Sequence, residues 1–167
     1  MKDEEVIAPD SRKRMPFGWS AVIGAGVIAS VVFQLLEFVL IPLTGGGRPW
    51  GPARMIAAMV MGPGALSGPA PELEMWIVAL VVDVALAIAY TAVLSFMIRR
   101  WQLGRAIVVG AVFGAVLYLV NFYGFTMVYP WFAIGRKGVT LFTHIAFSVT
   151  AVMAYKNLHG RTTLAQP

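Results

Sequence analysis

Four apolar runs, each close to the length of a membrane span, constrain the fold of this 167-residue chain more than any other feature. A helix needs about 20 consecutive apolar residues to cross a bilayer. In lipid, only helices and closed barrels satisfy the backbone polar groups, and these runs lack the strict alternation of barrel strands. We therefore predict an all-α membrane protein built as a bundle of four transmembrane helices. The expected spans are about 17–42, 75–98, 106–128 and 139–158.

The composition supports this class and argues against others. Hydrophobic residues make up 59% of the chain. Charged residues make up 13%, against roughly 25% in a typical soluble domain. The chain has no cysteine, which excludes disulfides, thiolate metal sites and cysteine nucleophiles. Because no catalytic motif is visible either, we expect no enzymatic activity.

The basic residues predict the direction of the spans. The formal net charge is +5, but the basic residues lie mainly at the ends of the apolar runs. This is the pattern of a membrane protein rather than of a nucleic-acid partner. Nine of them lie before the first run, between the second and third, or at and beyond the end of the fourth, and four lie in the other two connections. By the positive-inside rule, the tails 1–16 and 159–167 face the cytoplasm, on either side of a transmembrane domain at 17–158.

The stretch GGGRPWGPARMIAAMVMGPG, at residues 45–64, predicts a short extra helix between the first two spans. Its apolar part, about 53–61, is too short to cross a bilayer and too apolar for an ordinary loop. Glycines and prolines on both sides separate it from the neighbouring spans. It also lacks the GK[ST] ending of a phosphate-binding loop. We predict an interfacial or shallow re-entrant helix that caps the outer end of the bundle.

Polar side chains inside the spans predict an interior cluster. A charge within a span is costly in lipid and usually faces protein or water. Asp83, Asn121 and His144 lie roughly 5–7 Å outward of the midpoints of their spans, and Glu37 lies roughly 11 Å outward. Because the helices alternate in direction, all four residues lie in the same half of the bundle. This is the outer half, on the non-cytoplasmic side of the membrane. We predict that the four approach one another, with Arg54 as the counter-charge.

Small residues share the helical faces that carry these polar groups. Gly110 and Gly114 form a GxxxG pair, which permits close packing of transmembrane helices. Gly26 and Ser30 lie on the same face of the first span as Glu37. We expect these four small residues to pack against neighbouring helices.

The predicted cluster has a structural interpretation and functional ones. In the structural interpretation, Glu37 pairs with Arg48 or Arg54, Asp83 bonds to His144 or Arg54, and Asn121 joins two helices. In one functional interpretation, Glu37, Asp83 and His144 relay protons or cations. In another, these three residues hold a divalent metal.

Three functions follow from these interpretations. We rank first an accessory or structural subunit of a larger membrane complex, because the chain is small and lacks a soluble domain. Its partners would be the lipid bilayer and either other membrane subunits or further copies of itself. The alternative is a small proton- or cation-linked carrier. The second alternative is a metal- or cofactor-binding membrane subunit, although no particular cofactor is predicted and the metal ligands remain unassigned.

The segment FQLLEFVLIPLTGGGRPWGPARMIAAMVMGPGAL resembles a group of uncharacterised small four-span proteins of the bacterial inner membrane. The shared pattern is Glu37, a Gly/Pro/Trp segment at 45–52, an RMIAA helix at 54–60 and a glycine-to-leucine exit at 62–66. The group often carries His where this chain has Asp83, so no role at that position is implied. The resemblance implies that the chain lies in a bacterial inner membrane and that the segment between the first two spans has a specific role. It implies no chemistry.

Overall fold

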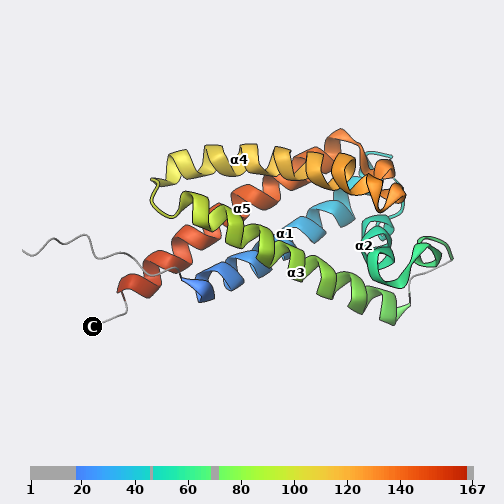
Figure 1. The fold of residues 1–167 in the computed structure, drawn as a ribbon, viewed down its shortest axis with the longest axis horizontal. Helices are drawn as coiled ribbons and strands as arrows, with labels where there is room; N and C mark the ends of the chain where they lie inside the picture. Colours follow the sequence, from blue (N-terminus) through green and yellow to red (C-terminus); the bar gives the residue numbers. More distant parts are fainter. Residues whose placement is uncertain (1–17, 46, 69–71, 165–167) are drawn as a thin grey trace, which may run out of the picture.

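A computed structural model describes residues 18–45, 47–68 and 72–164. It contains four long helices and a short one after the first, so the predicted all-α architecture is confirmed (Figure 1). The helices are α1 (Trp19–Leu43), α2 (Gly51–Met61), α3 (Leu73–Ile98), α4 (Leu103–Leu119) and α5 (Gly138–Leu164).

The bounds of α2 follow from its flanking residues. The helix begins at Gly51, two residues before the predicted start, because Pro52 occupies the first turn, where proline is favoured. It ends before Gly62, which has a φ of +83°, a left-handed conformation that glycine adopts without strain. A short 3₁₀ turn, η1 (Pro63–Leu66), follows.

The third span is regular over only part of its predicted length. Helix α4 ends at Leu119 and continues as a π-helical turn, η2 (Val120–Gly124), and a 3₁₀ turn, η3 (Phe125–Met127). Another 3₁₀ turn, η4 (Pro130–Gly135), then leads toward α5. The sequence pattern indicated only a continuous apolar span here.

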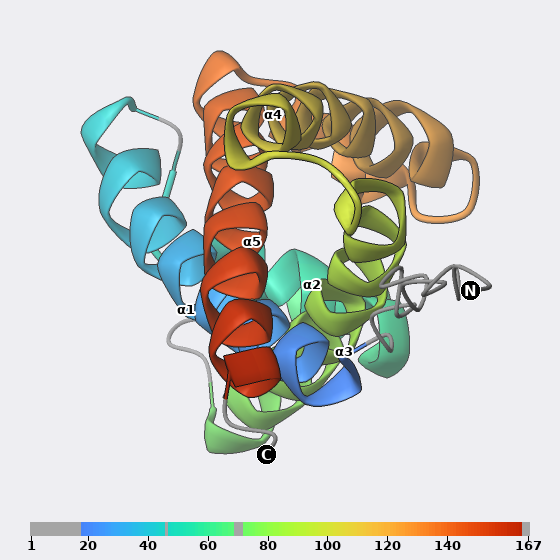
Figure 2. The same ribbon diagram turned by 90° about the vertical axis from the view of Figure 1, so that its left-hand side faces the viewer.

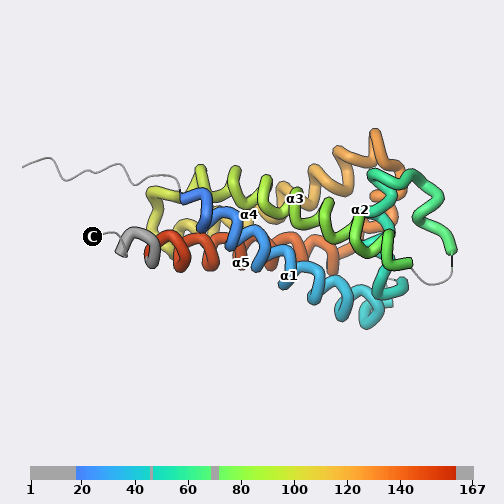
Figure 3. Tube along the Cα trace, turned by 90° about the horizontal axis from the view of Figure 1, so that it is seen from below, coloured from blue at the N-terminus to red at the C-terminus, as the bar shows by residue number. Residues whose placement is uncertain are grey.

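The long helices lie lengthwise in the molecule, which has two distinct ends (Figures 1 and 3). One end, called here the α2 end, holds α2, η1 and the turns between α4 and α5. The opposite end holds the start of α1, the α3–α4 connection and the end of α5. The described chain therefore begins and ends on the same side.

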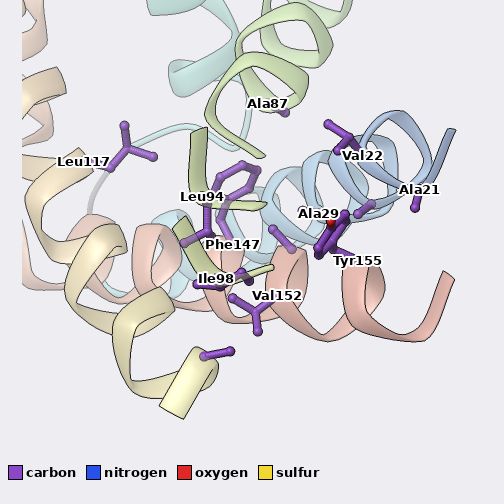
Figure 4. Packing of buried hydrophobic residues seen from close by; sticks show 13 residues of the cluster. Ala21, Val22, Ala29, Ala87, Leu94, Ile98, Leu117, Phe147, Val152 and Tyr155 are labelled. Carbon is purple, nitrogen blue, oxygen red and sulfur yellow. The ribbon is translucent and has the colours of Figure 1, made fainter. Parts of the chain in front are cut away.

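Helix α5 is the central element. It packs against α1 and α4, while α1 also packs against α3 (Figure 2). The main core includes Ala29, Leu94, Ile98, Val152 and Tyr155 (Figure 4). Helices α4 and α5 approach so closely that a Cβ at Gly114 would lie 2.5 Å from the carbonyl oxygen of His144.

The other small residues occupy helix contacts as well. A Cβ at Gly110 would lie 2.7 Å from Val152, and one at Gly26 would lie 2.9 Å from the Cα of Ile88 on α3. Glycine at these positions lets the backbones of neighbouring helices meet, as in other membrane bundles.

The outside of the bundle is apolar. Many large hydrophobic side chains are exposed along the long helices, among them Leu35, Val81, Val108 and Phe142. Four helical segments of 23 to 26 residues are long and apolar enough to cross a membrane, and each exceeds the roughly 30 Å thickness of a bilayer core. The chain is a multi-pass integral membrane protein.

Candidate functional site

Asp83 lies in the middle of α3 and faces α1. Its carboxylate accepts a 2.6 Å hydrogen bond from the Ser30 hydroxyl and a 3.3 Å bond from the Gln34 amide. Only 7% of the Asp83 surface is exposed. Because Ser30 and Gln34 are one helical turn apart on α1, both reach the same carboxylate.

Glu37 lies one turn beyond Gln34 on the same helix and is also buried. Its carboxylate accepts a hydrogen bond from Thr143 Oγ1 on α5, at 3.3 Å. Asp83 and Glu37 border the same cavity. A proton or another cation that binds there lowers the negative charge that the pair can carry.

His144 is fixed on both ring nitrogens. Nδ1 donates to the backbone carbonyl of Thr140 at 2.8 Å, because a carbonyl oxygen can only accept. The Tyr90 hydroxyl donates to Oδ1 of Asn121 at 3.1 Å, so the amide nitrogen of Asn121 faces Nε2 of His144 at 3.2 Å. Nε2 is therefore an acceptor in this arrangement, and the imidazole is neutral.

Aromatic rings surround the imidazole. The rings of Phe33, Tyr118 and Phe122 meet it edge to face, with centroids 5.0, 6.1 and 5.4 Å away. These rings come from α1, α4 and the π-helical turn. They hold His144, which is 4% exposed, in an apolar surrounding.

The π-helical turn positions Asn121 opposite His144. Such turns free backbone groups from the regular helical bonds and are frequent at functional sites. Here Arg136 donates from Nε to the carbonyl of Phe122 at 2.8 Å and from its guanidinium to Thr126 at 3.1 Å. The same guanidinium lies 4.4 Å from the ring centroid of Tyr123. One arginine thereby stabilises the end of the third span.

Arg54, on α2, faces the η1 turn. Its guanidinium donates to the backbone carbonyls of Ala65 (2.8 Å) and Ser67 and, at 3.4 Å, to that of Gly68. Arg54 is 8% exposed. These contacts connect α2 to the chain that follows it. The role of Arg54 as counter-charge to Glu37 or Asp83 stays a prediction.

All five residues of the predicted cluster line one cavity of about 290 Å³. Glu37, Arg54, Asp83, Asn121 and His144 reach it from α1, α2, α3, the π-helical turn and α5. Arg48 and Ile134, both exposed, line it as well, so the cavity reaches the surface at the α2 end.

The donor set of the cavity suits hydrogen bonding more than metal binding. Within the described residues, no group of three or more His, Cys, Asp or Glu side chains could hold a metal ion. The hydrogen bonds described above also occupy both nitrogens of His144.

The three side chains described as bonding Asp83 and Glu37 were not among the predicted cluster. Ser30 was expected only as a packing residue, yet it bonds Asp83. Gln34 and Thr143 bond the two carboxylates. The shared helical face of Ser30, Gln34 and Glu37 was the available signal, whereas Thr143 had none.

Comparison of the chain with protein-family models, with curated proteins and with solved structures found no match. No family is therefore identified, and the resemblance of residues 33–66 to small bacterial inner-membrane proteins assigns no residue a role.

Proposed function

We propose that this protein is a small proton- or cation-linked carrier whose binding site is the cavity at the α2 end. One observation carries the proposal: two buried carboxylates from different helices, Glu37 and Asp83, line the same surface-connected cavity as His144. Ionisable groups that face an internal cavity in a membrane protein commonly mark the path of an ion or substrate.

The geometry suits exchange between a proton and another cation. Glu37 and Asp83 can each bind a proton and both line the cavity, so protons and another cation would compete for the same groups. The closed core around Leu94, Ile98 and Tyr155 separates the cavity from the opposite end. Transport would require the helices to open at that end while they close at the α2 end.

The accessory-subunit function is the competing proposal. It is supported by the small size of the chain and by its extensive exposed apolar surface. It does not explain why two acids line a cavity that reaches the surface, and for this reason we favour the carrier.

The proposed setting is a bacterial inner membrane with both termini in the cytoplasm. In this orientation the cavity opens to the non-cytoplasmic side. The distribution of basic residues, nine on the side of the termini and four on the other, supports it.

Flux through the purified chain tests the proposal. The protein is reconstituted in liposomes that contain a pH dye, and a cation gradient is imposed. We expect proton movement in native liposomes that disappears in Asp83→Asn. Glu74→Gln is the matched control, because Glu74 is an exposed acid on the same helix, and it should leave the flux unchanged.

A folded native protein that moves no protons under any cation gradient would overturn the carrier. Co-purification of larger membrane proteins with the same inactive chain would then support the accessory subunit.

A further inference from the structure

The wall of the cavity is mostly apolar. Aromatic and aliphatic side chains from several helices line it, among them Phe33, Met55, Leu117, Phe132 and Phe147. Its volume of about 290 Å³ lies at the lower end of pockets that bind small organic molecules. A bare inorganic cation requires several oxygen ligands, whereas these side chains offer a surface for an apolar body.

The acidic side chains that line the cavity are Glu37 and Asp83. The described hydrogen bonds to these carboxylates come from neutral groups, namely two hydroxyls and one amide. Neutral donors orient a carboxylate without cancelling its charge. A cationic group that reaches this part of the cavity therefore gains a strong, poorly screened attraction.

His144, which lines the same cavity, adds no positive charge. The imidazole of His144 is held neutral by Thr140 and Asn121. Phenylalanine rings nearby can face a cation and attract it through their π electrons. This part of the cavity thus favours a compact cation over an anion.

The entrance has the opposite charge. Arg48, which is exposed, and Lys137, which is half-buried, line the cavity, and Arg48 lies over the Trp50 ring at 5.7 Å. Repulsion from these residues grows with the charge of an entering cation, so it penalises a dication more than a monocation. Burial of an apolar body against the wall offsets this repulsion.

We propose that the ligand of the cavity is a monovalent organic cation, an ammonium group on a compact apolar body. The ammonium group lies at Glu37 and Asp83, and the apolar body lies against the aromatic wall. The inference rests on the proposed function for transport of this ligand, but binding can be measured separately.

Three compounds of nearly equal shape test the charge requirement. These are 2-phenylethylamine, a cation at neutral pH, 2-phenylethanol, which is neutral, and phenylacetate, an anion. Each is titrated by calorimetry into the detergent-purified full chain. We expect the amine to bind at least about ten-fold more tightly than the alcohol, the ratio that corresponds to roughly 1.4 kcal/mol. Phenylacetate should not bind.

Variants locate the site. Glu37→Gln and Asp83→Asn, which keep a hydrogen-bond acceptor in place, should each lose the preference for the amine over the alcohol. Glu74→Gln should retain it. If a site variant fails to fold, the comparison of the three compounds on the native chain still decides the charge requirement.

Equal binding of amine and alcohol by the native chain, or an undiminished preference in both folded site variants, would overturn the inference. Binding of the amine without any flux would overturn the carrier but support the inference. Flux of potassium ions and protons without binding of the amine would support the carrier and overturn the inference.

Discussion

The Ser30 hydroxyl donates a 2.6 Å hydrogen bond to Oδ2 of Asp83 and thereby joins α1 to α3 beside the cavity. Both side chains are buried. The pair connects the packing of the bundle with the proposed binding site, since the hydroxyl sets the orientation of the carboxylate.

Ser30→Ala should destabilise the protein by about 1–2 kcal/mol, because a buried carboxylate loses a donor. Thermal unfolding in detergent measures the loss. Ser67→Ala is the matched control, because the hydroxyl of Ser67 is on an exposed residue and donates to the local carbonyl of Gly64, at 3.1 Å. Equal unfolding temperatures for the two variants would contradict the structural role of this hydrogen bond.

Gly114→Ala should destabilise the contact between α4 and α5 by about 1–3 kcal/mol, because the added methyl would meet backbone atoms of His144 and Ile145. Gly104→Ala, on the same helix, should be neutral or stabilising by up to about 1 kcal/mol, since no atom lies within 4 Å of its added methyl. Unfolding in denaturant compares the two. A neutral Gly114→Ala would show that the helices are farther apart than described.

Arg136→Lys should loosen residues 120–127. Lysine keeps the charge but cannot reproduce the planar donor arrangement toward Phe122 and Thr126. We expect amide hydrogen exchange in this segment to accelerate about ten-fold, for a loss of about 1.4 kcal/mol. Arg105→Lys, at an exposed position in the first turn of α4, should leave amide exchange in residues 120–127 unchanged. Identical exchange in both variants would argue against the stabilising role of Arg136.

Lys156→Met should destabilise the α3–α4 connection. The ammonium group of Lys156 donates to the carbonyls of Ile98 (2.9 Å), Arg99 (3.3 Å) and Trp101 (2.6 Å), at the end of α3 and in the α3–α4 connection. A loss of about 1.5–3 kcal/mol is expected from charged hydrogen bonds of this kind. The unfolding temperature of Lys156→Met should fall below that of Arg100→Met, which removes an exposed charge from the same connection. The reverse order would contradict this assignment.

The spans and the short helix could be predicted because each depends on local sequence. Apolar length sets α1 and α3, and glycine and proline set the ends of α2. The convergence of Asp83, Asn121 and His144 at one cavity also follows from their depth along antiparallel helices. By contrast, the sequence around Ser30 is the same whether its side chain only packs against a neighbouring helix or donates a hydrogen bond to Asp83.

The π-helical turn around Asn121 and the hydrogen-bond partners of Arg54 could not be predicted, because both depend on contacts with residues distant in sequence. The turn is stabilised by Arg136, which lies 14 residues beyond Phe122, the residue whose carbonyl it bonds. Arg54 bonds backbone carbonyls whose positions depend on how the chain folds after α2. Both arrangements are set by tertiary contacts rather than by local composition.

The existence of a cavity that opens at the α2 end can be tested by cysteine labelling, since the chain has no cysteine of its own. Asn121→Cys places a thiol in the cavity wall, and Ser148→Cys places one in the closed core beside Val152. A water-soluble, membrane-impermeant thiol reagent added on the α2 side of proteoliposomes should label Asn121→Cys and leave Ser148→Cys unmodified. Equal labelling of the two folded variants, or none in Asn121→Cys, would contradict the cavity on which the account depends.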